Sequence, residues 1–154
     1  MFDVRMARAA PALSIKQPWA ELILCGRKDV EVRSWSDRYR GPIWLHTGVK
    51  LDEIAAQQFQ MHSLFSGGLV GIAELTAIRP FTPELYESWR DRHLDFSPFP
   101  AGRDLFGWIL SSVRRLDRPR KCRGALGLFH VDTSEITDEE MQLLVSDGSL
   151  RSKR

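Results

Sequence analysis

The stretch from Leu13 to Trp35 constrains the fold most, because it joins an apolar strand, a helix, a glycine and a charged strand without a break. Pro18 stands where a helix can begin, since its missing N–H would be unpaired in the first turn anyway. Gly26 suits the left-handed position that ends a helix. An apolar stripe at helical spacing lies between them, made by Trp19, Leu22 and Ile23. We expect a helix that leads directly into a charged strand, an arrangement that indicates a functional site.

The charged strand carries Lys28, Glu31 and Arg33. In a regular strand Glu31 and Arg33 share one face and Lys28 points to the other. The three side chains converge only if Lys28 lies in the turn after Gly26, where a glycine permits unusual backbone angles. In that case Lys28 is a candidate nucleophile or proton carrier, and Arg33 is an orienting anchor. A solvated charged strand is the alternative interpretation.

Glu74 stands in a run that is apolar on both faces and shares parity with Ile72, so we expect its carboxylate on an inward face. A buried carboxylate needs a partner, and Lys28 or Arg33 is the expected cation. Glu31 or Glu74 would then be the acid and base of a reaction. A structural ion pair that holds two strands in register explains the same pattern.

The rest of the chain alternates strands and helices without a strict βαβ rhythm, which favours an α+β fold over a doubly wound sheet. Strands are expected at 42–47, 69–78, 105–116 and 125–131, and helices at 52–62, from 82 onward and at 137–145. Residues 1–10 are expected to be a poorly ordered lead-in, and a polar tail follows 146. The pattern alone does not separate a barrel from an open sheet.

Several motifs resemble the ASCH domains (activating-signal-cointegrator homology) of the PUA-like superfamily. The strongest are residues 14–20 (SIKQPWA) and the pattern GxKxxExR that begins at Gly26; further matches are 39–43 running into His46, 71–74 and 122–124. This resemblance implies a small β-barrel flanked by helices, with a cleft associated with RNA or modified nucleosides. It places the domain at 11–133, followed by a C-terminal helix and polar tail at 134–154.

The resemblance includes a bacterial branch of acetylcytidine amidohydrolases, which use a lysine, a threonine three residues later and a glutamate on a following strand. Lys28 and Glu74 match the first and last of these residues, but Glu31 stands in the threonine position. A carboxylate in place of a small hydroxyl means that this activity does not simply transfer. The Gln17–Trp19 segment points instead to the cointegrator-like branch, for which nucleic-acid binding is the general expectation.

Aromatic residues add a second feature, since Trp19 and Trp35 lie in or beside the opening unit. Indole faces are good platforms for unstacked bases, so one of these two is the candidate for base stacking. Trp44 is assigned to the core. His46 is a candidate ligand contact, although a lone histidine on a strand is commonly satisfied by a neighbour.

The charge is unevenly placed along the chain. The formal net charge of the chain is +2, but the segment from Arg114 to Arg123 contains six basic residues and a single acidic one, Asp117. The net charge of this segment is therefore +5, and that of the remaining chain is −3. We expect it to form a basic loop between two strands that contacts phosphates without reading sequence. A solvated loop is the alternative. The candidate contacts are Arg118, Arg120, Lys121 and Arg123.

Other site chemistries find little support. The chain has two cysteines without a CxxC spacing and four histidines without clustering, so neither a metal nor another cofactor is expected. No apolar run approaches the length of a membrane helix, and the N-terminus lacks the apolar region of a signal peptide. We expect a cytoplasmic protein.

The leading hypothesis is a protein that binds single-stranded RNA or a nucleotide in a cleft lined by Lys28, Glu31, Arg33 and Glu74, with DNA as another nucleic-acid partner. A second hypothesis is a metal-independent hydrolase that uses Lys28 and Glu74 to cut RNA or deacylate a modified nucleoside. A third is a protein-interaction module like those of transcriptional cofactors, which would show an exposed apolar patch beside a dry, closed cleft.

Overall fold

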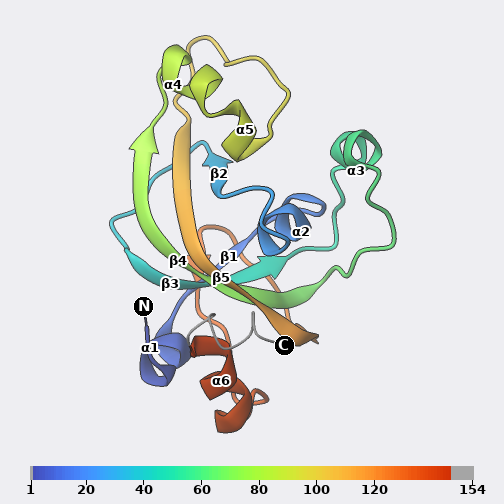
Figure 1. Cartoon of the computed structure of the whole chain (residues 1–154), viewed down its shortest axis with the longest axis vertical. Helices are drawn as coiled ribbons and strands as arrows, with labels where there is room; N and C mark the ends of the chain where they lie inside the picture. Colours follow the sequence, from blue (N-terminus) through green and yellow to red (C-terminus); the bar gives the residue numbers. More distant parts are fainter. Residues whose placement is uncertain (1, 147–154) are drawn as a thin grey trace.

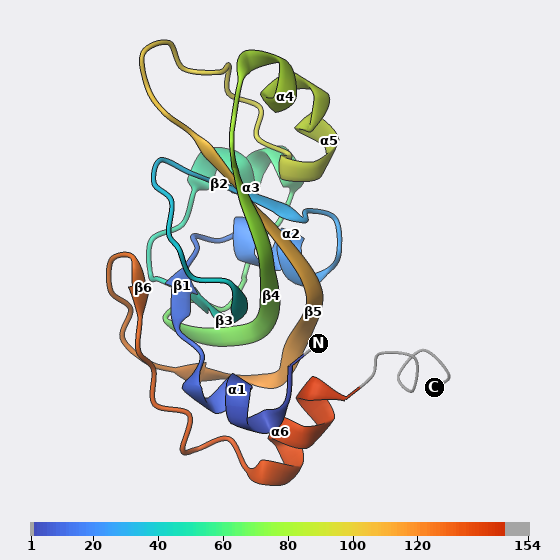
Figure 2. The same ribbon diagram turned by 90° about the vertical axis from the view of Figure 1, so that its left-hand side faces the viewer.

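A six-stranded sheet that curls strongly around itself forms the centre of the molecule (Figures 1 and 2). The computed structural model describes residues 2–146. The strand order is β2-β5-β4-β3-β1-β6, and among the described strands the β1–β3 pair is the one parallel pair. The strands are β1 (Ala12–Ser14), β2 (Val30–Arg33), β3 (Gly41–Thr47), β4 (Gly68–Pro80), β5 (Phe106–Lys121) and β6 (Leu128–Phe129).

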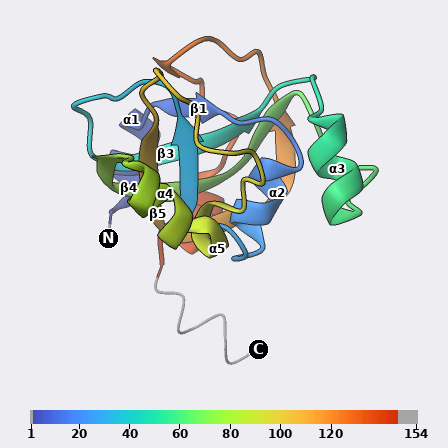
Figure 3. The ribbon, with the colours of Figure 1, turned by 90° about the horizontal axis from the view of Figure 1, so that it is seen from above.

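The helices flank the two ends and one side of the curled sheet. They are α1 (Val4–Ala9), α2 (Trp19–Leu24), α3 (Glu53–Phe59), α4 (Pro83–Ser88), α5 (Arg90–His93) and α6 (Asp138–Val145). Helices α1 and α6 lie together at one end, α4 and α5 at the other, and α3 stands to one side (Figures 1 and 3). The prediction of an α+β fold with a small β-barrel flanked by helices is confirmed: the curled sheet forms a half-barrel.

Local capping explains where several helices begin. The Thr82 hydroxyl accepts the N–H of Leu85, and Pro83 takes the first helical position, as expected. The Thr137 hydroxyl accepts the N–H of Glu140 and starts the predicted last helix. The predicted polar tail after 146 lies outside the described residues. None of the described helices has the length and apolar character needed to span a bilayer.

The curl of the sheet depends on close crossing of β4 and β5. A Cβ atom on Gly71 would lie 2.5 Å from the carbonyl oxygen of Arg114, so only a glycine lets the two strands approach this closely. The β4–β5 pairing also shifts register at three places, and such irregularities increase the bend of a strand. Both long strands can therefore curve around the interior.

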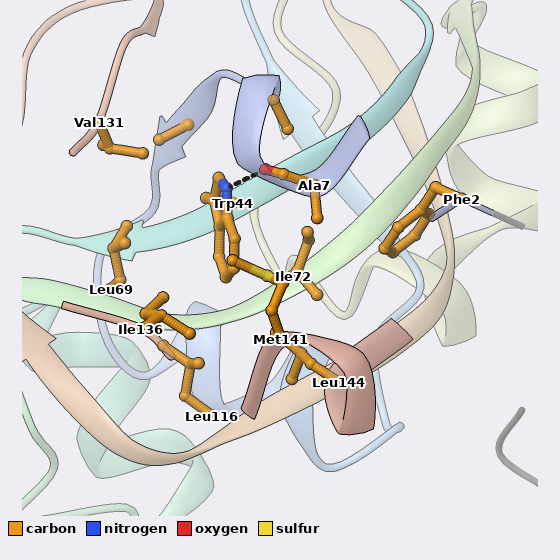
Figure 4. Close-up of a cluster of buried hydrophobic side chains, with 12 residues drawn as sticks. Phe2, Ala7, Trp44, Leu69, Ile72, Leu116, Val131, Ile136, Met141 and Leu144 are labelled. Atoms are coloured by element: carbon orange, nitrogen blue, oxygen red, sulfur yellow. Dashed lines mark hydrogen bonds between the residues drawn. The ribbon is translucent and has the colours of Figure 1, made fainter. Parts of the chain in front are cut away.

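Two apolar clusters lie on the two faces of the sheet. The barrel core fills the concave side and includes Leu13, Ile15, Ile43, Leu45, Ala73, Leu75 and Trp108. The helix-side core lies under α1 and α6 and includes Phe2, Ala7, Trp44, Ile72 and Met141 (Figure 4). Trp44 is fully buried there and donates from Nε1 to the carbonyl oxygen of Ala7 over 2.8 Å, which confirms its assignment to the core.

Two sequence expectations are wrong. Residues 2–10 are not a loose lead-in: they contain α1, and Phe2 and Ala7 are buried in the helix-side core. The basic segment is not a loop, because β5 continues to Lys121 and pairs with β4 as far as Gly68. Its arginines therefore alternate between the faces of a strand.

Candidate functional site

The candidate site lies at the seam where the ends of the curled sheet approach each other. Arg33 in β2 donates from Nη1 to the main-chain carbonyl of Ser14 in β1 over 3.3 Å, although these strands do not pair. Beside this bond is a cavity of about 640 Å³, here called the seam hollow. Its walls include Ser14, Trp19, Glu31, Arg33 and Trp35, and the exposed residues around it include Lys16, Val49, Lys50 and Leu126.

Three charged side chains of the predicted motif meet at the buried end of the seam hollow. The Glu31 carboxylate pairs through Oε1 with Lys28 Nζ at 3.3 Å and through Oε2 with Arg33 Nη1 at 3.0 Å. Glu31 is only 6 % exposed, so it is held as a desolvated anion between two cations. The expected convergence of the three residues is confirmed.

The turn after α2 brings Lys28 into this cluster. Gly26 adopts a φ of +85°, and the main-chain N–H groups of Arg27 and Lys28 both bond to the carbonyl of Leu22. Lys28 thus lies in the turn before β2 begins at Val30. This is the geometry under which the three side chains were expected to converge.

The Lys28 ammonium group is buried and bonded to acceptors within the protein. It is 2 % exposed, and its Nζ donates to the carbonyls of Val30 at 2.8 Å and His93 at 2.7 Å in addition to pairing with Glu31. These three acceptors use all three ammonium hydrogens. Burial lowers the pKa of Lys28, although the neighbouring Glu31 raises it. The geometry makes Lys28 a residue that positions Glu31 rather than an accessible nucleophile.

The two candidate stacking residues both line the seam hollow, and each contacts other residues of the protein. Trp19 donates from Nε1 to Asp52 Oδ2 over 2.9 Å, and its ring lies 4.9 Å from Lys28 Nζ. The Trp35 ring packs edge-on against Trp108 with centroids 4.7 Å apart. Two fixed indoles thus flank the charged cluster.

The expected pairing of Glu74 with Lys28 or Arg33 is wrong. Ala73 and Leu75 pack in the barrel core, so the alternating Glu74 lies on the other face of β4, with Ile72. Trp19, the neighbour of Lys28, packs against the barrel core. Glu74 is not among the described residues that line the seam hollow, and Glu31 is the carboxylate that pairs with both cations.

His46 is satisfied by its neighbours, as the structural interpretation expected. Its Nε2 lies 2.9 Å from the carbonyl oxygen of Cys122, which can only accept, so Nε2 carries the hydrogen. The Ser14 hydroxyl lies 3.0 Å from Nδ1, within hydrogen-bond distance. A Cβ on Gly124 would lie 2.6 Å from the ring, so the loop that covers His46 requires glycine there.

The four candidate phosphate contacts at the end of β5 and just after it divide into one buried residue and three exposed ones. Arg120 is only 8 % exposed and pairs with both carboxylate oxygens of Glu140 in α6, so it anchors that helix. Arg118, Lys121 and Arg123 are exposed. Arg123 lines a neighbouring cavity of about 500 Å³, the His46 hollow, which shares Ser14, Gly48, Val49, Ala125 and Leu126 with the seam hollow.

Sequence reasoning missed the two lysines beside the seam hollow. Lys16 comes shortly after β1, which ends at Ser14, and Lys50 comes shortly after β3, which ends at Thr47. Both are exposed. The two lysines come to the same end of the sheet because the adjacent strands β1 and β3 run parallel, a pairing that the sequence pattern did not indicate. Within residues 2–146, no group of three or more His, Cys, Asp or Glu side chains could hold a metal ion.

Comparison with known proteins adds a family and a fold. The model of the ASCH domain family matches residues 13–120. The crystal structure of ASCH from Zymomonas mobilis is similar to this chain with a TM-score of 0.61 and 17 % identity, over 90 % of this chain and 94 % of that one. Two point mutants of that protein match at 18 % identity and a TM-score of 0.59, over 90 % of this chain and 96 % or 97 % of theirs. No curated protein sequence matches the chain.

Proposed function

Because this chain belongs to the ASCH domain family, we propose that it binds single-stranded RNA and takes one unstacked base into the seam hollow. The ASCH domain is a PUA-like fold that is often implicated in RNA binding. The observation that carries the proposal is the pair of fixed indoles, Trp19 and Trp35, on the walls of one cavity beside a buried charge cluster. Sequence-specific RNA recognition commonly uses such aromatic surfaces to stack splayed bases.

The volume and the walls of the seam hollow suit a nucleobase. About 640 Å³ is within the size range of pockets that hold small molecules. Stacking of one base on an aromatic side chain contributes roughly 1–3 kcal/mol. Since Trp19 and Trp35 are both held by contacts within the protein, little further ordering is needed when a base enters.

The charges orient the nucleotide. At the inner end of the hollow the Glu31 carboxylate occupies one side of Arg33 and Lys28, whereas the exposed Lys16 and Lys50 have no such partner and attract a phosphate near the opening. Arg123, beside the His46 hollow, extends the positive surface. We therefore place the base inside and the sugar-phosphate backbone outside, across these three cations.

The two alternative functions have less support. A hydrolase that uses Lys28 and Glu74 would need both groups at one reacting atom, but the Lys28 ammonium is fully occupied and Glu74 lies on the other face of β4. An interaction module would need a closed cleft. Val49 and Leu126 are indeed exposed, at 80 % and 99 %, but they border an open cavity.

A salt titration tests the proposal. A short, fluorescently labelled single-stranded RNA is titrated with the protein at several salt concentrations, and the same DNA sequence is the comparison. Three phosphate contacts predict a slope of log K against log salt of about −2 for a single strand. If the protein does not bind the RNA at low salt, the proposal that it binds single-stranded RNA is wrong. If it binds the DNA more tightly than the RNA, single-stranded DNA is its nucleic-acid ligand instead.

A further inference from the structure

We propose that the seam hollow selects guanine, an inference that rests on the proposed function and names the base that the site accepts. The inner end of the hollow presents Glu31 and Arg33 side by side. Each Glu31 oxygen is held by one cation, which leaves further lone pairs, and an ionised carboxylate can only accept hydrogen bonds.

Arg33 has unused donors next to these acceptors. Its Nη1 donates to Ser14 and Glu31, whereas its Nε and Nη2 groups have no hydrogen bond to any residue within the described range 2–146. A guanidinium carries five N–H groups in a fixed planar arrangement. The charge cluster therefore offers a ligand one group of donors beside two carboxylate acceptors.

Guanine is the standard RNA base whose Watson–Crick edge matches this order. It presents an acceptor (O6) followed by two adjacent donors (N1–H and the N2 amino group), so O6 faces Arg33 and the two donors face Glu31. Uracil places a carbonyl oxygen on each side of its single N–H, and cytosine and adenine each have an unprotonated ring nitrogen beside the amino group. With those bases, a lone pair would face the Glu31 carboxylate.

Burial makes a mismatch costly. Glu31 is 6 % exposed, so a base that cannot donate leaves a desolvated carboxylate facing a carbonyl or ring nitrogen with little room for water. Charge-assisted hydrogen bonds contribute about 1.5–3 kcal/mol each, and a lost one leaves its partner unsatisfied. We therefore expect guanine to bind about tenfold or more tightly than the other three bases.

A nucleotide series tests the inference without altering the protein. The wild type is titrated with GMP, IMP, AMP, CMP and UMP at low salt, and tryptophan fluorescence reports binding. GMP should bind most tightly, and IMP, which keeps O6 and N1–H but lacks the N2 amino group, should lie between GMP and the rest. Equal affinities, or a preference for AMP, CMP or UMP, would overturn guanine selection while leaving RNA binding intact. Failure to bind any of them, together with failure to bind RNA, would overturn the proposed function itself.

A variant pair extends the test. Glu31→Gln replaces one acceptor oxygen with an amide donor of the same size. The ratio of the affinity for GMP to the affinity for AMP should therefore fall close to one. Glu87→Gln, which changes an exposed glutamate of α4 outside the hollow, should keep the preference. Thermal unfolding of both variants shows whether each is folded. A folded Glu31→Gln protein that still prefers GMP as strongly as the wild type would overturn the role of Glu31.

Discussion

Arg33 Nη1 lies 3.3 Å from the carbonyl oxygen of Ser14 and 3.0 Å from Glu31 Oε2, so one guanidinium joins two strands that do not pair with each other and also holds the buried carboxylate. Because β2 and β1 lie toward opposite ends of the curled sheet, this side chain closes the seam that neither strand closes by pairing. The same residue thus shapes the hollow and supplies donors to it.

Replacing Arg33 should therefore weaken binding more than its charge alone implies. Arg33→Lys keeps the charge but loses the planar arrangement of donors, and the affinity for a guanine-containing single-stranded RNA should fall about tenfold, as expected for loss of one good base contact. Fluorescence anisotropy measures the change. Arg5→Lys, at an exposed position in α1, is the control. Unchanged affinity in Arg33→Lys would contradict the role of the guanidinium.

Lys28 should resist chemical modification in the folded protein. Its ammonium is buried and has three protein acceptors, whereas Lys16 and Lys50 are exposed. Limited treatment with acetic anhydride, followed by mass spectrometry of the peptides, should acetylate Lys16 and Lys50 well before Lys28. The difference should disappear when the chain is unfolded in denaturant. Early acetylation of Lys28 in the folded protein would restore it as an accessible nucleophile.

His93 should make the fold sensitive to mild acid. It is buried, its Nε2 donates to the carbonyl of Tyr86, and its Nδ1 accepts from the N–H of Asp95. Burial lowers the pKa of His93 below 6.5, and the nearby Lys28 lowers it further. In the unfolded chain His93 binds a proton as the pH falls below about 6.5, whereas in the folded protein it stays neutral until a lower pH. The free energy of unfolding therefore falls as the pH drops from 6.5 toward the pKa of His93 in the folded protein.

Denaturant unfolding between pH 5 and 7 measures this effect. His93→Gln keeps a donor and an acceptor but cannot titrate, so its stability should depend less on pH than that of the wild type. His62→Gln, at an exposed position, should behave like the wild type. A His93→Gln protein with the same pH dependence as the wild type would show that His93 does not contribute it.

Replacing Arg120 should affect stability, whereas replacing Arg123 should affect RNA binding. Arg120→Gln breaks the ion pair between the buried Arg120 and the half-buried Glu140 and should lower the free energy of unfolding by about 3 kcal/mol. Arg123→Gln removes an exposed charge beside the His46 hollow and should change stability by no more than about 0.5 kcal/mol, but reduce RNA binding. Urea unfolding and anisotropy titration of both variants provide the two readouts. Loss of RNA binding in Arg120→Gln without loss of stability would return Arg120 to the binding surface.

The motif residues could be predicted from sequence because their placement depends on local structure. A proline before α2, a glycine after it and the spacing of Lys28, Glu31 and Arg33 together determine how the chain enters β2. These are short-range effects that sequence patterns record well. The convergence of the three charges was recoverable for that reason, and so was the burial of Trp44.

Glu74 could not be placed from sequence because β4 is buried on both faces. An apolar run predicts such a strand, but alternation then shows only that Glu74 and Ile72 share a face, not which core that face meets. Helix α1 escaped prediction for a related reason. Its six residues are too few for an independent helix, and packing of Ala7 beneath α6 stabilises it.

The basic segment misled because arginines and a proline are typical of loops. Long-range pairing overrides that local preference, since β5 pairs with β4 from Pro80 back to Gly68. Once the segment is a strand, its side chains alternate, and Arg120 turns inward to Glu140 while Arg118 remains outside. The composition of the segment predicted its positive charge but not which of its arginine side chains are buried and which are exposed.

The most direct test of base binding between Trp19 and Trp35 is the NMR signal of the indole N–H groups during titration with single-stranded RNA. The account predicts that the Trp19 and Trp35 signals shift as RNA is added. The Trp44 signal, buried against Ala7, and the Trp89 signal, outside the hollow, should stay in place. RNA binding with unchanged Trp19 and Trp35 signals would contradict the account.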